Sequence, residues 1–264
     1  MSLRLSTWNI NSVRLRINLV TAFLERMQPD VICLQETKTP DPFFPLKAFE
    51  KLGYVHHVIA GQKGYHGVAI LSRWPFEARD RRNWCGKDDA HHVHATLEGG
   101  IEVHNFYIPS GGDIPDPAVN EKFAHKLMFL DEAAEWFTGR CRPGGKMILV
   151  GDLNVAPSEF DVWSHKQLLG VVSHTPIEVE KLTRLQGTGW IDAIREFHPE
   201  PEKLYSWWSY RAQDWRASNR GRRLDHIWVT PPLKPHLRSV HIMDEARGWQ
   251  QPSDHVPVTV DLEV

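Results

Sequence analysis

Short runs in which apolar residues alternate with polar ones, or stand together, recur along the whole chain and predict β-strands. Ten such runs are rich in branched and aromatic side chains: 3–8, 31–35, 54–59, 67–71, 92–97, 101–107, 147–150, 224–229, 237–242 and 256–262. Because successive side chains of a strand point to opposite faces of a sheet, these runs predict sheets with at least one buried face.

Two longer segments space their apolar residues three or four positions apart, as a helix with one buried face does. The stripe in residues 13–27 consists of Val13, Ile17, Val20, Leu24 and Met27, and that in residues 118–137 of Val119, Phe123, Leu127, Leu130, Ala134 and Phe137. We interpret the second stripe as core packing rather than as a surface for a partner. With a further helix expected near 178–186, the mixture of strands and helices indicates an α/β or α+β protein.

The chain shows no break long enough to be a linker between domains. Segments rich in Pro and Gly at 109–117 and 140–145 are short, and we interpret them as loops. A chain of 264 residues is long enough to bury a substantial core. We therefore predict one domain over residues 1–264.

The composition is that of a globular protein, with 41% hydrophobic and 24% charged residues. No apolar run approaches the roughly 20 residues that span a bilayer. The first ten residues alternate like a strand and lack the apolar segment of a secretory signal. The three cysteines, Cys33, Cys85 and Cys141, are odd in number and widely spaced, with Cys33 in an apolar run typical of a core. We therefore expect a protein of the reducing cytoplasm with no membrane partner.

The net charge of −2 argues weakly against nucleic-acid binding, but the basic residues are unevenly distributed. Residues 211–223 contain five arginines against one aspartate, and aromatic residues surround them: Tyr205, Trp207, Trp208, Tyr210 and Trp215. Arginine among aromatic rings suits contacts with phosphates and stacking on bases. A second basic cluster, in residues 79–87, we interpret as a solvated loop.

Several predicted strands end in residues that could do chemistry. In residues 148–157, ILVGDLNVAP, an apolar run stops at Gly151 and places Asp152 and Asn154 two positions apart. A turn would account for this pair, since Asp, Asn, Gly and Pro end strands for backbone reasons. Polar residues also stand at other strand boundaries, however: Asn9, Asn11, Glu36, Tyr107, Asp225, Asp254 and His255. A sheet gathers its strand ends along a common edge, so we expect these side chains to converge.

This set of side chains favours one type of chemistry. Carboxylate and amide oxygens without paired histidines or thiolates prefer Mg²⁺ or Mn²⁺ to zinc. Beside such an ion, a base and neutral donors suit hydrolysis of a phosphate ester, because the charge on the phosphoryl oxygens is neutralised while water attacks. No P-loop, nucleophile elbow or dinucleotide-binding motif in the sequence competes with this interpretation.

Motifs that span residues 4 to 262 resemble those of one known family. In chain order they are TWNINSVR, PDVICLQETK, GYHGVAILSR, NFYIPSGG, GDLNVAP, YSWWSYR, NRGRRLDHIWV and PSDHVPV. Together they resemble the exonuclease III type of AP endonuclease, in the endonuclease/exonuclease/phosphatase superfamily. The resemblance implies a four-layer α/β sandwich, in which two packed mixed β-sheets are flanked by helices and the active site lies at one edge of the sheets.

The resemblance also implies roles for the matching residues. Glu36 would be the principal Mg²⁺ ligand, with Asn11 and Asp254 near the ion, and Mn²⁺ could substitute for Mg²⁺. Asp152 would orient and deprotonate the attacking water, although the residues leave open whether Asp152 or His255 is the base. Asn154 would hold the water or a phosphoryl oxygen, and Asp225 would pair with His255. Asn9 and Tyr107 would contact the phosphate or the leaving oxygen.

The implied substrate is duplex DNA with abasic sites or damaged 3′ ends, incised 5′ to the lesion by a monomer. Trp207 and Leu224 match the walls of the pocket for the base-less sugar, and Arg211 begins the basic segment beside it. Two positions depart from the family pattern. Ser110 stands where relatives commonly carry Asn or Gln, and Arg222 where some carry a second pocket tryptophan. The balance of AP endonuclease, 3′-to-5′ exonuclease and 3′-phosphatase activity therefore stays open.

Two other functions fit a chain with these motifs. One is a catalytically lapsed family member that binds nucleic acid or protein, against which the retained carboxylates and His255 argue. The other is a phosphatase or phosphodiesterase for a small phosphorylated molecule, against which the basic, aromatic segment argues. Trp249 could face DNA or pack in the core. The HHVH run at 91–94 puts His92 and His94 on one strand face, which we interpret as a solvated sheet face rather than a zinc site.

Overall fold

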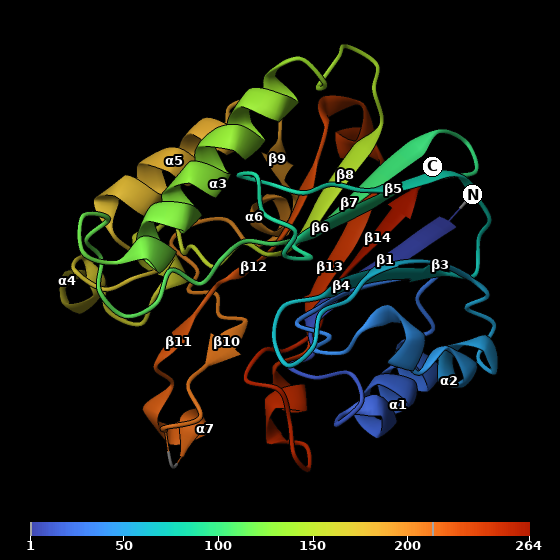
Figure 1. Ribbon diagram of the computed structural model, residues 1–264, viewed down its shortest axis with the longest axis horizontal. Helices are drawn as coiled ribbons and strands as arrows, with labels where there is room; N and C mark the ends of the chain where they lie inside the picture. Colours follow the sequence, from blue (N-terminus) through green and yellow to red (C-terminus); the bar gives the residue numbers. More distant parts are fainter. Residues whose placement is uncertain (1, 213) are drawn as a thin grey trace.

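The computed structural model describes residues 2–212 and 214–264, which form two six-stranded sheets packed face to face with helices on both outer faces (Figure 1). This arrangement confirms the predicted four-layer α/β sandwich. Both sheets contain parallel as well as antiparallel neighbours, so both are mixed.

The first sheet has the strand order β13-β14-β1-β2-β4-β3. Its strands are β1 (Ser2–Asn9), β2 (Val31–Gln35), β3 (His56–Ala60), β4 (Val68–Ser72), β13 (Leu237–Ile242) and β14 (Val258–Glu263). Strands β1 and β2 are parallel, and helix α1 (Ile17–Met27) connects them. Their carboxyl ends therefore lie side by side.

The second sheet has the order β5-β6-β7-β8-β12-β9. Its strands are β5 (Phe76–Arg81), β6 (His92–Leu97), β7 (Ile101–Tyr107), β8 (Met147–Asp152), β9 (Ile191–Asp192) and β12 (Asp225–Val229). Here β7 and β8 are the parallel pair, connected by the long helix α3 (Glu121–Thr138). A separate ribbon of β10 (Trp207–Trp208) and β11 (Gly221–Arg222) projects beyond the sheets (Figure 1).

Helices cover the outer faces of both sheets (Figure 1). The other α-helices are α2 (Leu46–Glu50), α4 (His165–Leu168), α5 (Pro176–Gln186), α6 (Ala193–Phe197) and α7 (Trp215–Ser218), and the 3₁₀ helices are η1 (Asp41–Phe43), η2 (Glu159–Asp161), η3 (Pro231–His236) and η4 (Asp244–Gly248). Apolar residues of α1 and α2 pack on the first sheet, and those of α3 and α5 pack on the second. None of the helices within the described residues is long and apolar enough to cross a membrane.

The main core lies between the two sheets. Alternate residues of β1 and β2 belong to this core, including Leu3, Leu5, Val31 and Cys33, which are fully buried. The intervening positions, such as Ile32, face the helices of the outer layer. Burial of one such side chain stabilises the fold by roughly 1.5–3 kcal/mol, so the two-sided burial of β2 explains its unbroken apolar sequence. The expectation that Cys33 is a core residue is confirmed.

The predicted elements agree with the structure except at a few places. Helix α1 begins at Ile17, since residues 13–16 form turns, and α5 begins at Pro176, where Thr175 and Glu178 form a capping box. The interpretation of residues 79–87 as a solvated loop is wrong in part, because Arg79 and Arg81 lie in edge strand β5. Five of the six β5 residues are exposed, so the strand carries no alternating pattern that sequence could show.

The solvated face predicted for His92 and His94 is also wrong. His92 is 1% exposed and stacks on Phe106, with ring centroids 3.9 Å apart. Trp136 of α3 covers both histidines from the outer layer. Of the predicted stripe, Leu130, Ala134 and Phe137 pack against this sheet, and Phe123 and Leu127 are buried beside Val172, as expected for a core helix. The prediction is wrong for Val119, which precedes α3 and is 71% exposed.

Candidate active site

The candidate active site lies where the two parallel strand pairs end. In the first sheet Asn9, the last residue of β1, is level with Gln35 at the end of β2. In the second sheet Tyr107 of β7 is level with Asp152 of β8. Because the sheets pack face to face, both pairs of carboxyl ends meet at one edge of the sandwich. The structure therefore brings the strand-end residues together, as the sequence predicted.

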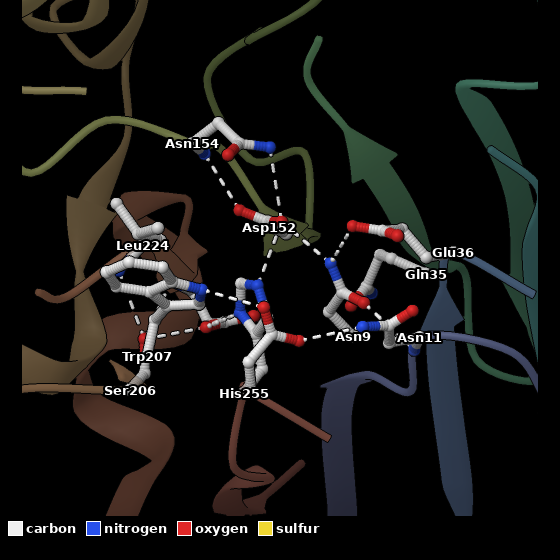
Figure 2. A network of polar contacts seen from close by, with 12 residues as sticks. Asn9, Asn11, Gln35, Glu36, Asp152, Asn154, Ser206, Trp207, Leu224 and His255 are labelled. Carbon is white, nitrogen blue, oxygen red and sulfur yellow. Dashed lines mark hydrogen bonds and ion pairs between the residues drawn. The ribbon is translucent and has the colours of Figure 1, made fainter. Parts of the chain in front are cut away.

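Asn9 links the two sheets through its side-chain amide (Figure 2). Its Nδ2 donates hydrogen bonds to Asp152 Oδ2 at 2.8 Å and to Glu36 Oε1 at 2.9 Å. Asn154 donates its backbone N–H to Asp152 Oδ1 at 2.9 Å and its side-chain amide to Asp152 Oδ2 at 3.2 Å. Asp152 is 1% exposed. Its carboxylate therefore accepts hydrogen bonds from these protein donors in place of water.

The GDLN sequence is more than a turn. Asp152 still belongs to β8, and the glycine before it is required by the neighbouring strand. A Cβ at Gly151 would lie 1.9 Å from the carbonyl oxygen of Phe106, so only glycine lets β8 approach β7 this closely. The close approach sets Asp152 beside Tyr107 at the edge of the sheet.

Four polar residues of this site have backbone angles in the left-handed region. Their φ values are 48° at Asn11, 49° at Glu36, 52° at Lys38 and 53° at Asn154. Each such residue costs about 1–3 kcal/mol, and clusters of them are typical of active sites, where the surrounding fold imposes the conformation. The segments after β1, β2 and β8 therefore hold their polar side chains at some cost in stability.

Glu36, Asp152 and His255 each direct one ligand atom to a common region, with these atoms all within 4.8 Å of one another. Lys38 Nζ lies 2.7 Å from Glu36 Oε2 and donates to Asn11 Oδ1 at 2.6 Å. The oxygens of Glu36, Asp152 and Asn11 thus form a hard, anionic donor set that already attracts a cationic group. Such a set fits Mg²⁺ or Mn²⁺.

Asp254 braces this cluster through protein hydrogen bonds. Its Oδ1 accepts from Asn11 Nδ2 and its Oδ2 from Trp207 Nε1, each at 3.0 Å. The expected role of Asp254 near the ion stays a prediction, since the structure shows it orienting Asn11 and the pocket wall.

His255 lies next to Asp152 (Figure 2) and forms a buried pair with Asp225. Its Nδ1 donates to Asp225 Oδ2 at 2.8 Å, and its Nε2 lies 3.6 Å from Asp152 Oδ2. Burial alone would lower the pKa of His255, but the charges of Asp225 and Asp152 outweigh it and raise this pKa to about 10. The imidazole is therefore a cation at neutral pH.

The pKa of Asp152 is also raised. Burial is the main cause, His255 opposes it, and the charges of Asp225 and Glu36 add to it. A carboxylate with a raised pKa binds a proton from water more readily than an ordinary one, which suits a general base. Burial likewise raises the pKa of Tyr107 well above its ordinary value, so its hydroxyl stays protonated and can donate.

A pocket of about 600 Å³ opens beside these residues. Its walls include the predicted pocket and DNA-contact residues Trp207, Leu224, Arg222, Arg211 and Ser110. The Arg222 guanidinium lies over the Trp207 ring, 5.2 Å from its centroid, and donates to Ser173 Oγ at 2.7 Å. Arg222, one of the two departures from the family pattern, therefore stacks on an aromatic wall of the pocket.

Sequence reasoning assigned no role to three polar residues that organise the site. Lys38 joins Glu36 to Asn11, and its motif LQETK gave the signal. Ser206 donates to Asp225 Oδ2 at 2.6 Å and accepts the backbone N–H groups of Leu224 and Asp225. Lys126 donates a hydrogen bond to the carbonyl of Asn154. A lone serine or a lysine inside a helical stripe gives no such signal in the sequence.

Lys126 of α3 is fully buried beneath the segment that carries Asn154. Its Nζ forms an ion pair with the equally buried Glu178 and donates to the Asn154 carbonyl at 2.8 Å. Glu178 also accepts the backbone N–H of Ser173 at 2.9 Å. This pair supports the active-site segment from behind.

Replacing Lys126 with methionine is expected to lower the free energy of unfolding by about 3–5 kcal/mol, because it leaves the Glu178 carboxylate buried without a partner. Urea unfolding followed by tryptophan fluorescence measures the change. Lys122→Met is the matched control, since Lys122 is exposed on the same helix, and its effect should stay within about 0.5 kcal/mol. Equal stability of the two variants would contradict the supporting role of the pair.

Trp249 has a packing role. Its ring meets the buried Trp8 ring edge-on, with centroids 6.2 Å apart, at the border of the cluster beneath α1. Of the two alternatives left open by the sequence, the structure supports packing.

Comparison with known proteins places this site in a family. The sequence matches the model of the Endonuclease/Exonuclease/phosphatase family over residues 6–255. The chain belongs to this family. The predicted resemblance is therefore confirmed, and the match spans every site residue from Asn9 to His255.

Relatives within the endonuclease/exonuclease/phosphatase family match nearly the whole chain. Exodeoxyribonuclease III of Haemophilus influenzae is 33% identical over 97% of this chain and 98% of its own. The structure of an AP endonuclease from Archaeoglobus fulgidus superposes with a TM-score of 0.92 and 31% identity, covering 99% of this chain and all of the other. A 3′ phosphatase from Neisseria, solved with a product DNA hairpin, gives a TM-score of 0.91 and 30% identity over 99% and 100% of the two chains.

Proposed function

We propose that this protein is a Mg²⁺-dependent phosphodiesterase of DNA repair, which incises duplex DNA 5′ to abasic sites and also removes nucleotides or phosphate from 3′ ends. The observation that carries the proposal is the meeting of Glu36, Asp152 and His255 within 4.8 Å, although they lie more than 100 residues apart in sequence. The pocket of about 600 Å³ beside them supplies the place for the substrate.

The donor set suggests how the reaction is divided among the residues. Glu36, with Asn11 and Asp254 beside it, would hold Mg²⁺, which Mn²⁺ could replace. When bound, such an ion neutralises charge on the phosphoryl oxygens and lowers the barrier to attack. The other catalytic roles belong to protein side chains around the scissile phosphate.

Asp152 would take the proton from the attacking water, because it is a buried carboxylate with a raised pKa and is held by Asn9 and Asn154. Asn154 would share that water or a phosphoryl oxygen. The His255 imidazolium, supported by Asp225, would donate to the phosphate and stabilise the charge that develops there.

The remaining donors, Asn9 and Tyr107, lie beside Asp152. Asn9 and the protonated Tyr107 hydroxyl would contact a phosphoryl oxygen or the leaving oxygen. In this division Asp152 removes the proton, and the neighbouring donors stabilise the charge that develops on the phosphate.

The pocket favours a DNA substrate over a small phosphorylated molecule. Trp207 and the buried Leu224 form an apolar wall of the size that a base-less deoxyribose needs. Arg211, Arg220 and Arg222 line the same pocket and suit the flanking phosphates. A nucleotide without a base leaves the stack at low cost, so the pocket can select damage without reading sequence. Ser110 can donate one hydrogen bond to a phosphate from the pocket rim.

The relatives support both activities named in the proposal. One structural relative is an AP endonuclease and another a 3′ phosphatase, and both match this chain at about the same level. We infer further that the whole chain acts as one catalytic domain and as a monomer, since one chain supplies the entire cluster. The three free cysteines are consistent with a cytoplasmic location.

One assay tests this proposal directly. The purified protein is incubated with three duplexes, one with a central abasic analogue, one with a nick carrying a 3′-phosphate and one intact and blunt, each with Mg²⁺ and with EDTA. We expect incision 5′ to the lesion or release of the 3′-phosphate at rates at least tenfold above degradation of the intact duplex, and no reaction in EDTA. Failure to act on any duplex, with hydrolysis of inositol phosphates or another small phosphate ester, would overturn the proposal.

A further inference from the structure

A second cluster of metal-ligating side chains lies behind Tyr107, outside the catalytic set. It consists of three histidines and one aspartate from three segments of the chain. His66 comes from the loop before β4, Asp89 and His91 from the segment before β6, and His125 from α3. The nuclease mechanism proposed above uses none of them.

Two pairs of ligand atoms in this cluster are spaced as in a zinc site. Asp89 Oδ2 lies 3.5 Å from His91 Nε2 and 3.2 Å from His125 Nε2. His66, Asp89 and His91 place one ligand atom each within 4.8 Å of the others. In a tetrahedral zinc site with bonds of about 2.0–2.1 Å, neighbouring ligand atoms are roughly 3.3 Å apart. Two of the edges of such a tetrahedron are thus already formed.

Hydrogen bonds outside the cluster set the tautomers for metal binding. His91 Nδ1 bonds the backbone carbonyl of Tyr107, and His66 Nδ1 bonds that of Asp89 at 3.1 Å. A carbonyl only accepts, so each Nδ1 carries the proton and each neutral ring keeps its lone pair on Nε2. Histidines that bind metals are typically oriented in this way by the second nitrogen.

The lone pair of His91 then faces a carboxylate. His91 is 1% exposed, and its Nε2 makes no hydrogen bond within the described residues. Burial lowers the pKa of His91 to about 3, so the ring is neutral at pH 7. A lone pair directed at this half-buried carboxylate is repelled unless a cation lies between them.

A neighbouring histidine cluster differs from this one because an arginine already neutralises its carboxylate. His94, Glu102 and His104 also gather ligand atoms within 4.8 Å of one another. There, however, the guanidinium of Arg140 lies 2.6 Å from Glu102 Oε1 and neutralises it. Among the described residues, no lysine or arginine forms such an ion pair with Asp89, which lies against His91 and His125.

We propose that His66, Asp89, His91 and His125 form a Zn²⁺ site that is separate from the catalytic metal site. Imidazole and carboxylate ligands in a tetrahedral arrangement favour Zn²⁺ over Mg²⁺, which prefers oxygen ligands in an octahedron. The ion joins two loops to α3. Because the His91 ring stacks on Tyr107, with centroids 5.2 Å apart and planes at 15°, the ion also steadies the end of β7 in the active site.

Zinc binding to the full-length protein tests this proposal. The protein is stripped of metal and dialysed against Zn²⁺ in the presence of millimolar Mg²⁺, which occupies the hard oxygen site, and bound zinc is measured by atomic emission. We expect about one tightly held Zn²⁺ per chain. The variants H66Q and H125Q should bind zinc roughly 100-fold more weakly or worse, since even loss of a supporting partner costs 10- to 100-fold.

Two further variants make the assignment specific. H94Q removes a histidine from the cluster that Arg140 already neutralises, so it should bind zinc like the wild type. E36Q alters the catalytic carboxylate, and it too should retain the ion. Circular dichroism without metal confirms that H66Q and H125Q are folded, as their side chains are only partly buried. Zinc binding that is equal in wild type and H125Q, or that disappears in E36Q, would overturn the proposal.

Thermal unfolding gives a readout independent of stoichiometry. A ligand that binds only the folded state stabilises it in proportion to the logarithm of its concentration over Kd. Zn²⁺ should therefore raise the Tm of the wild type and of H94Q but not that of the H66Q/H125Q double variant. The same rise in all three proteins would contradict the site.

Discussion

The variant D152N is expected to lower kcat on abasic DNA by roughly 10³- to 10⁴-fold, while its affinity for DNA stays within a few-fold of the wild type. Asp152 is buried between Asn9 and Asn154, at the edge where the sheets meet, and does not line the pocket that would bind DNA. Its loss removes a group that acts in the transition state. Single-turnover kinetics and a separate equilibrium binding measurement distinguish the two effects.

Asparagine at position 152 also changes the local hydrogen bonds. Both carboxylate oxygens accept from N–H donors of Asn9 and Asn154, so the new amide group faces a donor in either orientation. The folded state must therefore be checked by thermal unfolding. The control D80N makes the same change in an exposed residue of β5 and should leave kcat within about twofold. Near-full activity of D152N would show that another group is the base.

Elements with a buried face were the ones that sequence could predict. The bounds of β2, β6 and β7 agree with the predicted runs, because most of their residues are buried. The bounds of β13 agree as well, because its apolar residues Leu237, Val240 and Ile242 pack against the core although they are only partly buried. Strand β5 was missed because both its faces are largely exposed, so burial left no mark on its sequence. The two-residue strands β9, β10 and β11 are too short to carry any period.

The site was predictable for a different reason. Residues such as Asn9 and Asp152 sit at the ends of strands whose apolar runs are easily recognised, and the carboxyl ends of parallel strands collect at one edge. Supporting residues lack such a landmark. Lys126 stands inside a helical stripe, and its buried partner Glu178 is 52 positions away. Their pairing depends on how α3 and α5 pack, which no local pattern specifies.

The histidine cluster behind Tyr107 illustrates the same limit. His66 and His125 stand 59 positions apart on a loop and a helix, and Asp89 lies in an irregular segment between them. The HHVH run drew attention to His92 and His94, which face α3. The ligand candidate is instead His91, whose ring stacks on Tyr107 and lies near His125 at the other end of α3's contact with this sheet. A shift of this segment by one residue would therefore change which histidine lies in which cluster.

The second large effect is expected for D225N, which should lower kcat at pH 8 by roughly 10²- to 10³-fold. Asp225 raises the pKa of His255, which is about 10, and it also adds to the raised pKa of Asp152. In the wild type, the rate should rise with pH as Asp152 loses its proton and fall as the His255 imidazolium loses its own near pH 10. Removing the Asp225 charge lowers both pKa values, so both limbs of the profile should move to lower pH.

The direction of the limb that follows the His255 pKa decides which residue is the base. If Asp152 is the base, D225N is slower at pH 8, because His255 has lost the charge with which it stabilises the phosphate. If His255 is the base, it must be neutral to act, and the wild type with a His255 pKa of about 10 holds it almost wholly protonated at pH 8. The wild-type rate would then rise rather than fall toward pH 10, and D225N would move that rising limb to lower pH. A base-stable abasic analogue keeps the substrate intact across the pH range, and the control D80N should leave both limbs in place because its charge is exposed and screened by salt.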